Sequence, residues 1–361
     1  MEETRASRAS HGWESGGLVM RNKLVQISTA VKNFVKDRTM IVGGGFPMSR
    51  QTNIFIKEIL RQRRAGNIRL NDMFWVEPGV GFGGDLLIAE GVVDSVISTF
   101  TSHARPGLSN VCRRALEQGI PRKIKWDDES NLTLNLKIMA GALNIPFIPS
   151  NSGIWGDLSK PGLWDRAVPY RKNVLYEDPY GSGKKVALLQ ALRPELSVVH
   201  VQFADTHGNG IMLGSMYYDY WIGRAGKNIV LVADHIVDSE MCARFPNLVS
   251  IPGAGVSAVV PWYLGAWPSN SPGLYGEDLE HMSQFIKISK KEDTLHEYIE
   301  KYVYSWKTYD EYLDLIGRDK IKSLESNPST VLTESFGKWI YPTQKVSELV
   351  AEAEVALSRV G

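Results

Sequence analysis

Short apolar runs recur along this chain, and each ends in a glycine-rich or polar turn that leads into a helical pattern. The clearest runs span 39–42, 73–76 and 95–101. Strands that alternate with helices along a chain pair in parallel, because the connection must cross a face of the sheet. The sequence therefore predicts an α/β fold, with an open, mostly parallel sheet flanked by helices. From about residue 277 onward the pattern is helical, which predicts a helical C-terminal region.

The domain organisation follows from where these patterns begin and change. Residues 1–20 are polar at first and lack the apolar centre of a signal peptide, so we expect a disordered tail with an alternative natural start at Met20. Residues 21–290 form the predicted α/β domain, and 291–361 a helical region packed on it. Within the first of these, residues 154–184 show no periodicity and predict a long ordered excursion.

Composition excludes several classes of function. The chain is 43% hydrophobic and 22% charged, with a net charge of +1, so no basic footprint for nucleic acid or membrane is present. It has two cysteines, Cys112 and Cys242, and its histidines lack metal-ligand spacing, so we expect no metal site. No apolar run is long enough to span a bilayer. A cytoplasmic location is the resulting expectation.

The first glycine-rich turn is the strongest candidate for ligand contact. Three glycines, Gly43, Gly44 and Gly45, precede Phe46, and an amphipathic helical run begins after Arg50. Glycines let a ligand approach the backbone, and the following helix N-terminus can offer free N–H groups to an anion. A tight turn without a ligand explains the glycines equally well. Arg50 is predicted either to meet a substrate carboxylate or phosphate, or to be a solvated charge.

A second turn, Gly79-Val80-Gly81-Phe82-Gly83-Gly84, matches the spacing of a dinucleotide fingerprint. The acidic residue expected about 20 positions later is missing, which argues against nicotinamide or flavin binding. Glu77 precedes this turn at the end of a strand. It is either a nucleophile or base, or an ion-paired loop residue.

Other catalytic signatures are absent or weak. Gly181-Ser182-Gly183-Lys184 lacks the first glycine of a P-loop, and no G-x-S-x-G elbow occurs. His103 follows a strand end beside Ser102, which makes these two residues candidates for a site. A structural role for His103 is the alternative.

Read together, the turns resemble the α subunit of glutaconate-type CoA-transferases, within the family I enzymes. The resemblance covers roughly residues 22–315. Its matching motifs are Gly44-Gly45-Phe46 with Arg50, Gly83-Gly84-Asp85, Asn110-Val111-Cys112-Arg113-Arg114, the stretch 141–149, Tyr176-Glu177-Asp178-Pro179, Asp205 with Gly208-Asn209, and the stretches 258–261 and 265–269.

The resemblance implies a fold shared by α and β subunits, with the active site near their interface. It implies that the nucleophile is a glutamate from the β subunit, which attacks the acyl-CoA, and that CoA passes through a glutamyl-CoA thioester. Coenzyme A is then a substrate, and no tightly bound cofactor is expected. The assembly would hold two α and two β subunits, or more. The implied acyl-group and rim residues in this chain are Gly44, Gly45, Phe46, Arg50, Gly79, Gly81, Gly83, Gly84, Ser102, His103, Asn131, Asn151 and Ser152.

The chain departs from the family pattern at three points. Glu77 stands in a strand-Glu-x-Gly form like that of the β subunit, so it is a candidate nucleophile in this chain. Asn131 stands near a Gln-Gly of acetoacetate-type relatives, and Trp267 replaces a common histidine. These changes leave open a CoA-thioester hydrolase (ring-opening) or a decarboxylase of the same fold. A non-catalytic ligand sensor is a further alternative.

Overall fold

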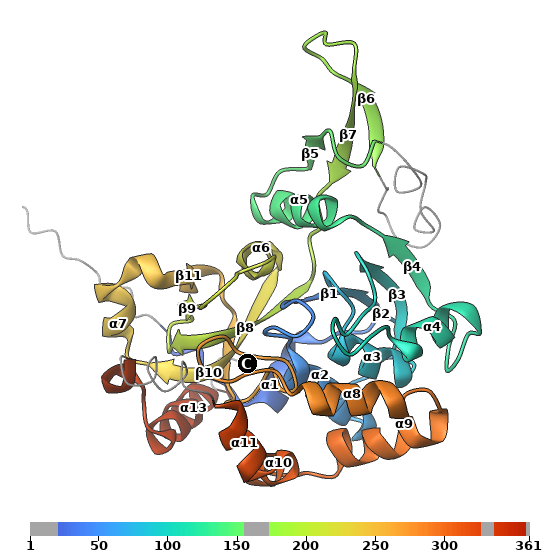
Figure 1. Cartoon of the computed structure of the whole chain (residues 1–361). Coiled ribbons are helices and arrows are strands. Elements are labelled where there is room, and N and C mark those ends of the chain that lie inside the picture. The colour runs from blue at the N-terminus through green and yellow to red at the C-terminus, as the bar shows by residue number, and fades with distance from the viewer. Residues whose placement is uncertain (1–20, 155–172, 326–335, 359–361) are drawn as a thin grey trace, which may run out of the picture.

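The structure is a computed structural model that describes residues 21–154, 173–325 and 336–358. The predicted tail 1–20 and most of the predicted excursion lie outside these residues. Within these residues the main sheet has nine strands, and its parallel strands follow the order β12-β10-β8-β1-β2-β3-β4 (Figure 1). These strands are β1 (Met40–Gly43), β2 (Met73–Val76), β3 (Val93–Ser98), β4 (Lys125–Asp128), β8 (Leu196–Asp205), β10 (Asn228–Val237) and β12 (Ala258–Pro261).

Five further strands depart from the parallel pattern. Two of them, β9 (Gly210–Ile211) and β11 (Val249–Ile251), extend the main sheet in antiparallel fashion beyond β8. The other three form a separate antiparallel sheet that projects from the body together with α5 (Figure 1): β5 (Phe147–Ser150), β6 (Val174–Glu177) and β7 (Lys185–Gln190). The predicted excursion therefore contains a strand, β6. Its sequence shows no strand pattern, and it is a regular strand because it is hydrogen-bonded to β7.

Alternate residues of the parallel strands supply two cores. In β2, Met73 and Trp75 belong to one core, whereas Phe74 and Val76 belong to the other. This alternation follows from the two-residue repeat of a strand with both faces covered. Helices α1 (Ile27–Phe34), α2 (Asn53–Arg64), α3 (Phe82–Ala89) and α4 (Asn110–Glu117) contribute to the first core, and α5 (Asn131–Ala142) and α6 (Asp219–Ala225) to the second.

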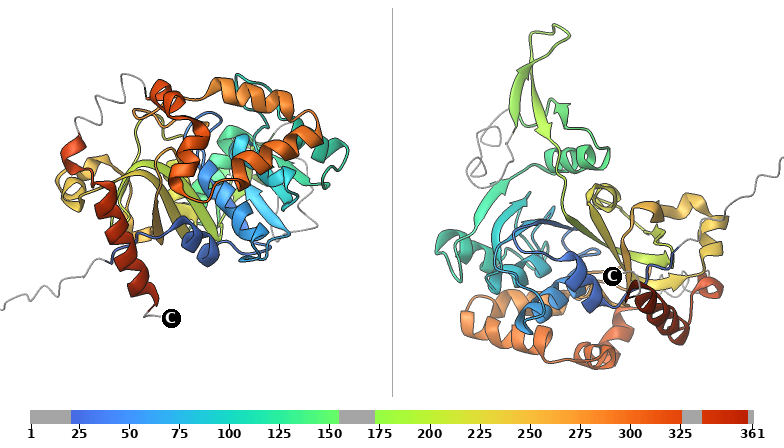
Figure 2. Two further views of the ribbon diagram at one scale, coloured as in Figure 1. Left: turned by 90° about the horizontal axis from the view of Figure 1, so that it is seen from below. Right: turned by 180° about the vertical axis from the view of Figure 1, so that it is seen from behind.

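The C-terminal helices share the first core rather than forming a core of their own. Leu295, Val303 and Tyr312 are buried in the same cluster as the residues of α2 and α3. Figure 2 shows these helices along one side of the α/β body. They are α8 (Leu279–Ile288), α9 (Glu292–Ile299), the π-helical turn η5 (Glu300–Tyr304), α10 (Tyr309–Ile316) and α11 (Arg318–Leu324). The last helix, α13 (Thr343–Ser358), instead contributes Val350 to the second core.

Short elements complete the fold: α7 (Ser239–Arg244) and the 3₁₀ turns η3 (Pro246–Leu248), η4 (Gly253–Gly255) and η6 (Gly337–Trp339). Among the described helices, none is both long and apolar enough to cross a bilayer. The predicted α/β class with a mostly parallel sheet is confirmed. Helix α3 begins at Phe82, and α6 begins at Asp219.

Candidate functional site

The first glycine turn lies where the order of the parallel sheet reverses. Strand β1 pairs with β2 on one side and with β8 on the other, and the turn follows the carboxyl end of β1. In open α/β sheets this reversal leaves a crevice in which ligands bind. The position of the turn is therefore the position at which the fold favours a site.

The backbone N–H groups of this turn are bonded within the chain. Gly44 N–H donates to the carbonyl of Val198 at 2.8 Å, and Phe46 N–H donates to that of Ser49 at 2.9 Å. Gly45 N–H donates to Asp219 Oδ1 at 2.6 Å. None of these three N–H groups is free, because the turn bonds to itself, to β8 and to α6.

Arg50 and Asp219 form a buried ion pair behind the turn. Arg50 Nη2 lies 3.1 Å from Asp219 Oδ2, and both side chains are fully buried. The guanidinium also donates to the carbonyls of Leu213 and Ser215. Burial raises the pKa of the Asp219 carboxyl, whereas the charge of Arg50 acts in the opposite direction. Arg50 is neither a solvated charge nor aimed at open space, and in this structure it holds the turn in place.

The second turn is organised around Glu77, which is 2% exposed. Trp75 Nε1 donates to Glu77 Oε2 at 2.9 Å, and Gln51 Nε2 donates to Oε1 at 2.8 Å. Burial, with a contribution from the charge of Asp85, raises the pKa of Glu77 to about 8. At neutral pH this carboxyl is therefore mostly protonated. It is enclosed by its own neighbours and not solvated.

The glycines of the second turn allow close packing. A Cβ at Gly79 would lie 2.7 Å from the ring of Phe100, and one at Gly81 would clash with Gln51. Gly83 and Gly84 lie inside the first turn of α3, not before it as predicted. A Cβ at Gly83 would meet Ile56 of α2, and one at Gly84 would lie 2.6 Å from Glu77 Oε2. Small residues are needed here because α2, α3 and Glu77 approach one another closely.

His103 is buried beneath the predicted rim. It is 1% exposed, and its Nε2 lies 2.8 Å from Asp85 Oδ2. Ser109, which caps α4, donates to the other oxygen of Asp85. Ser102 is partly exposed, and its hydroxyl donates to the carbonyl of Gly107 at 3.2 Å. His103 thus anchors the loop after β3, and Ser102 lies on that loop nearer to solvent.

The other predicted rim residues gather around the start of α5. Asn131 is exposed, and its Oδ1 accepts a hydrogen bond of 2.9 Å from Tyr218 Oη. Asn151 and Ser152 follow β5, which belongs to the separate sheet and not to the main one. A Cβ at the adjacent Gly153 would lie 3.2 Å from Thr133 of α5, which places this loop beside the same helix end.

Trp267 faces the C-terminal helices. It is 1% exposed, and its Nε1 donates to Asp278 at 3.2 Å. Lys57 Nζ lies 4.7 Å from the centroid of this ring and has no hydrogen-bond partner within the described residues. Burial lowers the pKa of Lys57 to about 7. Trp267 therefore provides an aromatic contact for a buried lysine.

Aromatic side chains from three loops meet beside the first turn. The ring of Phe46 stacks on Tyr217 at 5.1 Å between centroids and meets Phe100 edge-on at 5.5 Å. Tyr217 is 46% exposed, and Phe46 and Phe100 are partly exposed. The prediction contained Phe46 but neither Phe100 nor Tyr217. It also missed Asp219, whose sequence signal is slight: one acid among aromatic residues ahead of a helix.

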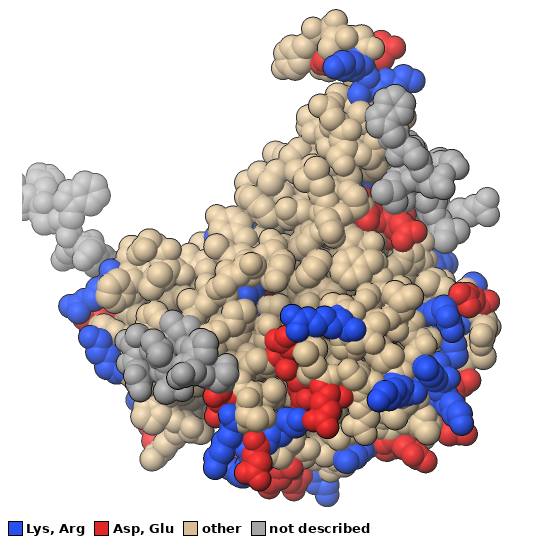
Figure 3. All heavy atoms as spheres, viewed as in Figure 1, with Lys and Arg blue, Asp and Glu red and all other residues tan. Residues whose placement is uncertain are grey.

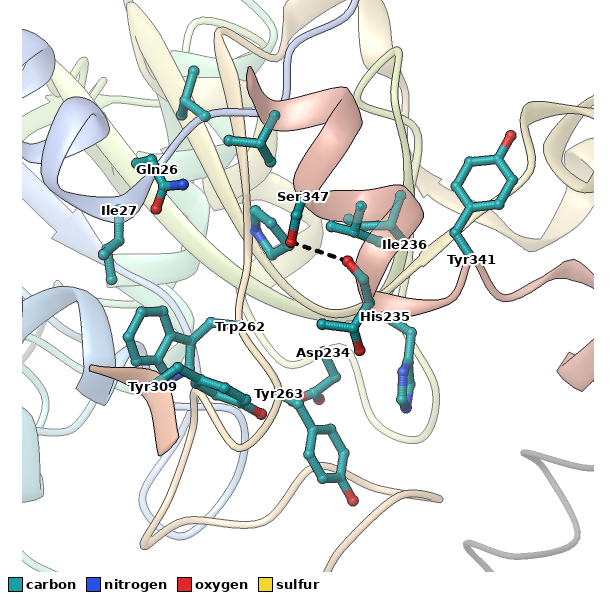
Figure 4. Close-up of a pocket in the computed structure, with 15 residues that line it drawn as sticks. Gln26, Ile27, Asp234, His235, Ile236, Trp262, Tyr263, Tyr309, Tyr341 and Ser347 are labelled. Atoms are coloured by element: carbon teal, nitrogen blue, oxygen red, sulfur yellow. Dashed lines mark hydrogen bonds between the residues drawn. The ribbon is translucent and has the colours of Figure 1, made fainter. Parts of the chain in front are cut away.

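An apolar cavity lies away from both turns. It has a volume of about 410 Å³ and lies between β10, β12 and α13, where Trp262, Tyr263 and Tyr309 line one side (Figure 4). None of the predicted site residues lines it. Asp234 there already accepts hydrogen bonds from Ser271 and Tyr275. Within the described ranges, no group of three or more histidine, cysteine or acidic residues is placed to hold a metal ion.

The family model for coenzyme A transferases matches residues 24–261. The chain belongs to this family. It is therefore an enzyme chain of the transferase type, which favours catalysis over the ligand-sensor alternative. The matched range contains both glycine turns and the aromatic cluster, so the site described above lies within the family's common region.

Individual relatives extend the similarity over most of the chain. It is 28% identical to a glutaconate CoA-transferase chain of Acidaminococcus fermentans, over 85% of this chain and 96% of that one. The crystal structure of glutaconate coenzyme A-transferase from the same organism superposes with a TM-score of 0.78 at 26% identity, over the same shares. An uncharacterized protein of Archaeoglobus fulgidus is 32% identical over 83% of this chain, which spans 64% of that longer protein. The predicted family and fold are confirmed.

Proposed function

We propose that this chain is the α subunit of a heteromeric CoA-transferase, which moves CoA between an acyl-CoA and a carboxylic acid. Coenzyme A is then a substrate, and no tightly bound cofactor is needed. The proposal is supported by the match over nearly the full length of a protein named as one subunit of glutaconate CoA-transferase. It is also supported by the position of the turns at the strand-order reversal of the sheet.

The burial and protonation of Glu77 support the proposal that the two subunits have different roles in catalysis. A carboxylate that attacks a thioester must be ionised and must reach the carbonyl carbon. Glu77 is buried, bound by Trp75 and Gln51, and its pKa is raised to about 8. It meets neither condition at neutral pH. In line with the family resemblance, we therefore place the catalytic glutamate on the β subunit.

In the proposed reaction the partner's carboxylate attacks the thioester carbonyl, and the CoA thiolate leaves to give a mixed anhydride. The thiolate then attacks the glutamyl carbonyl of the anhydride, which releases the first carboxylic acid and forms the glutamyl-CoA thioester. The acceptor acid repeats these two steps in reverse order. The part of this chain is to hold the acyl group in place beside the first turn.

The surface of the chain supports a partner subunit. Charged side chains gather on the lower half of the face seen in Figure 3, whereas the upper half is largely uncharged. Most of the large apolar side chains that are more than a third exposed lie at or near α5, on the separate sheet and on α6: Leu132, Leu143, Phe147, Val174, Leu175, Tyr176, Tyr180 and Tyr220. An exposed apolar surface of this kind is typical of a protein interface. An assembly of two α and two β subunits, or larger, is our expectation, and light scattering of the complex measures it.

The test uses the complex purified with its partner subunit. It is incubated with acyl-CoA donors and carboxylate acceptors, and CoA exchange is followed by chromatography. The expected result is exchange that requires the acceptor. Borohydride should also reduce an enzyme-bound thioester and so inactivate the enzyme. Release of free CoA without an acceptor would instead identify a hydrolase of the same fold. Loss of carbon dioxide would identify a decarboxylase.

A further inference from the structure

We infer that the acyl group handled at this site is apolar, and that the exposed faces of Phe46, Phe100 and Tyr217 receive it in preference to an acyl group that carries a second carboxylate. The inference rests on the proposed function and adds the class of substrate. It is carried by the position and exposure of the three rings, by the backbone that presents them, and by the charges around them.

The three rings form one surface although they come from distant parts of the chain. Phe46 follows β1, Phe100 follows β3, and Tyr217 precedes α6. Their centroid distances of 5.1 and 5.5 Å put them in direct contact. Each ring keeps some exposure beside the first turn, and Met216 next to Tyr217 is 41% exposed. Aromatic faces held together in this way offer apolar contact without a large loss of side-chain entropy.

The backbone that presents the rings adopts left-handed conformations at several non-glycine residues. Met48, Arg50 and Tyr217 have φ values of 74°, 46° and 46°. Such conformations cost of order 1–3 kcal/mol each and persist where the surroundings hold them, commonly at functional sites. Here Asp219 supplies that constraint, because it binds both Gly45 N–H and Arg50. The rings therefore stand on a rigid, strained frame whose buried ion pair fixes both the Gly45 turn and the start of α6.

The charged groups of this frame are already paired. Arg50 is committed to Asp219 and two carbonyls, and His103 is committed to Asp85. Arg105, on the loop after β3, is 73% exposed and lies 3.9 Å from Glu277. A second carboxylate on the acyl group would need a cation or several donors beside the rings. Among the described residues, the cation that lies over these rings is Arg50, 5.9 Å from the Tyr217 centroid, and its charge is already paired with Asp219, which disfavours a dicarboxylic acyl group.

The test compares hexanoyl-CoA with glutaryl-CoA, whose acyl groups have similar length and differ in the terminal carboxylate. Exchange onto acetate is measured with the complex, and binding of each thioester is measured by calorimetry. We expect kcat/KM and affinity to favour hexanoyl-CoA by at least about tenfold, as burial of a few methylene groups provides. Equal values, or a preference for glutaryl-CoA, would overturn the inference.

Substitutions of Tyr217 test whether the aromatic cluster causes the preference for hexanoyl-CoA. Tyr217→Ala should lower kcat/KM for hexanoyl-CoA about tenfold and change that for glutaryl-CoA by less than about threefold. Tyr217→Phe keeps the ring and should behave like the wild type. The matched control is Phe245→Ala, since Phe245 is a 40% exposed aromatic residue at the end of α7, outside both the cluster and the apolar surface assigned to the partner.

The outcomes separate this inference from the proposed function. The inference alone would be contradicted if Tyr217→Ala lowered kcat/KM for both thioesters by the same factor while the melting temperature of the complex stayed within a few degrees of the wild type. Absence of CoA exchange with every donor and acceptor would contradict the proposed function. In that case the calorimetric preference between the two thioesters still decides the inference.

Discussion

The two glycine turns have similar sequences but are stabilised in different ways. The turn after β1 is fixed by a fully buried ion pair, Arg50 with Asp219. The turn after β2 is fixed by Glu77, a buried carboxyl that meets no cation among the described residues and whose raised pKa keeps it mostly protonated at neutral pH. Both turns follow strands of one parallel sheet and meet at one edge. A glycine-rich sequence therefore indicates a tight turn, but not how its polar groups are satisfied.

The difference has consequences for function. A paired charge is insensitive to moderate changes in pH, but the loss of one partner leaves the other charge buried. A lone buried carboxyl responds to pH, because its ionisation is not offset by a counter-charge. The first turn is thus a fixed support for the aromatic cluster, and the second is a pH-sensitive one.

The largest effect should follow from breaking the first turn. Asp219→Asn removes the counter-charge of Arg50, and we expect the free energy of unfolding to fall by roughly 3–5 kcal/mol in chemical denaturation at pH 7. The matched control is Asp314→Asn, in an exposed pair with Arg318, with an expected change of less than about 0.5 kcal/mol. Equal changes for the two variants would show that the buried pair does not support the turn.

The pH response of the second turn should be the next largest effect. Glu77 has a pKa of about 8 when folded and 4.5 as its ordinary value, so the folded chain holds an extra proton between these pH values. Its contribution is therefore fully present below about pH 4.5 and is lost as the pH rises through 8. Between pH 5 and pH 9 the wild type should lose about 2–4 kcal/mol more stability than Glu77→Gln. Parallel stability curves for the two proteins would rule out this account.

Substitution of the glycines should produce smaller losses at both turns. A Cβ at Gly44 would lie 2.8 Å from Asp219 Oδ1, and one at Gly84 would lie 2.6 Å from Glu77 Oε2. Gly44→Ala and Gly84→Ala should each cost about 1–3 kcal/mol by denaturation. Gly255→Ala is the control, because its Cβ would meet nothing nearer than 3.6 Å. If Gly44→Ala were as mild as the control, the close packing of Asp219 on the turn would be wrong.

The smallest effect concerns the link from the first turn to α5. Tyr218→Phe removes the hydrogen bonds from Tyr218 Oη to Asn131 and leaves the ring beside Phe46. The expected loss is about 0.5–1.5 kcal/mol, measured as a shift of the melting temperature. An unchanged melting temperature would mean that α5 does not depend on this contact.

The sequence predicted the sheet because its signals are local. Strand runs such as 73–76 and the turns after them follow from short-range patterns, and the parallel order follows from the helices between them. The strand β6 was missed, since it depends on hydrogen bonds to β7 and its own pattern shows no alternation of burial. Local patterns identify elements that carry their own signal, whereas strands stabilised by a neighbour need the structure.

The site was predicted less completely for a similar reason. Gly44, Gly45 and Phe46 were identified because their turn is continuous in sequence. Asp219 is separated from Gly45 by 174 positions, so nothing in the sequence connects the two. The burial of Arg50 and His103 could not be predicted, because their acidic partners, Asp219 and Asp85, come from other elements.

The central claim is that this chain shapes the site while the nucleophile comes from a partner subunit. The most direct measurement incubates the complex with acyl-CoA, traps the enzyme-bound thioester with borohydride, and locates the modified residue by peptide mass spectrometry. We predict that the modification lies on a glutamate of the partner and that Glu77→Gln leaves its yield unchanged. Modification of Glu77 in this chain would contradict the account.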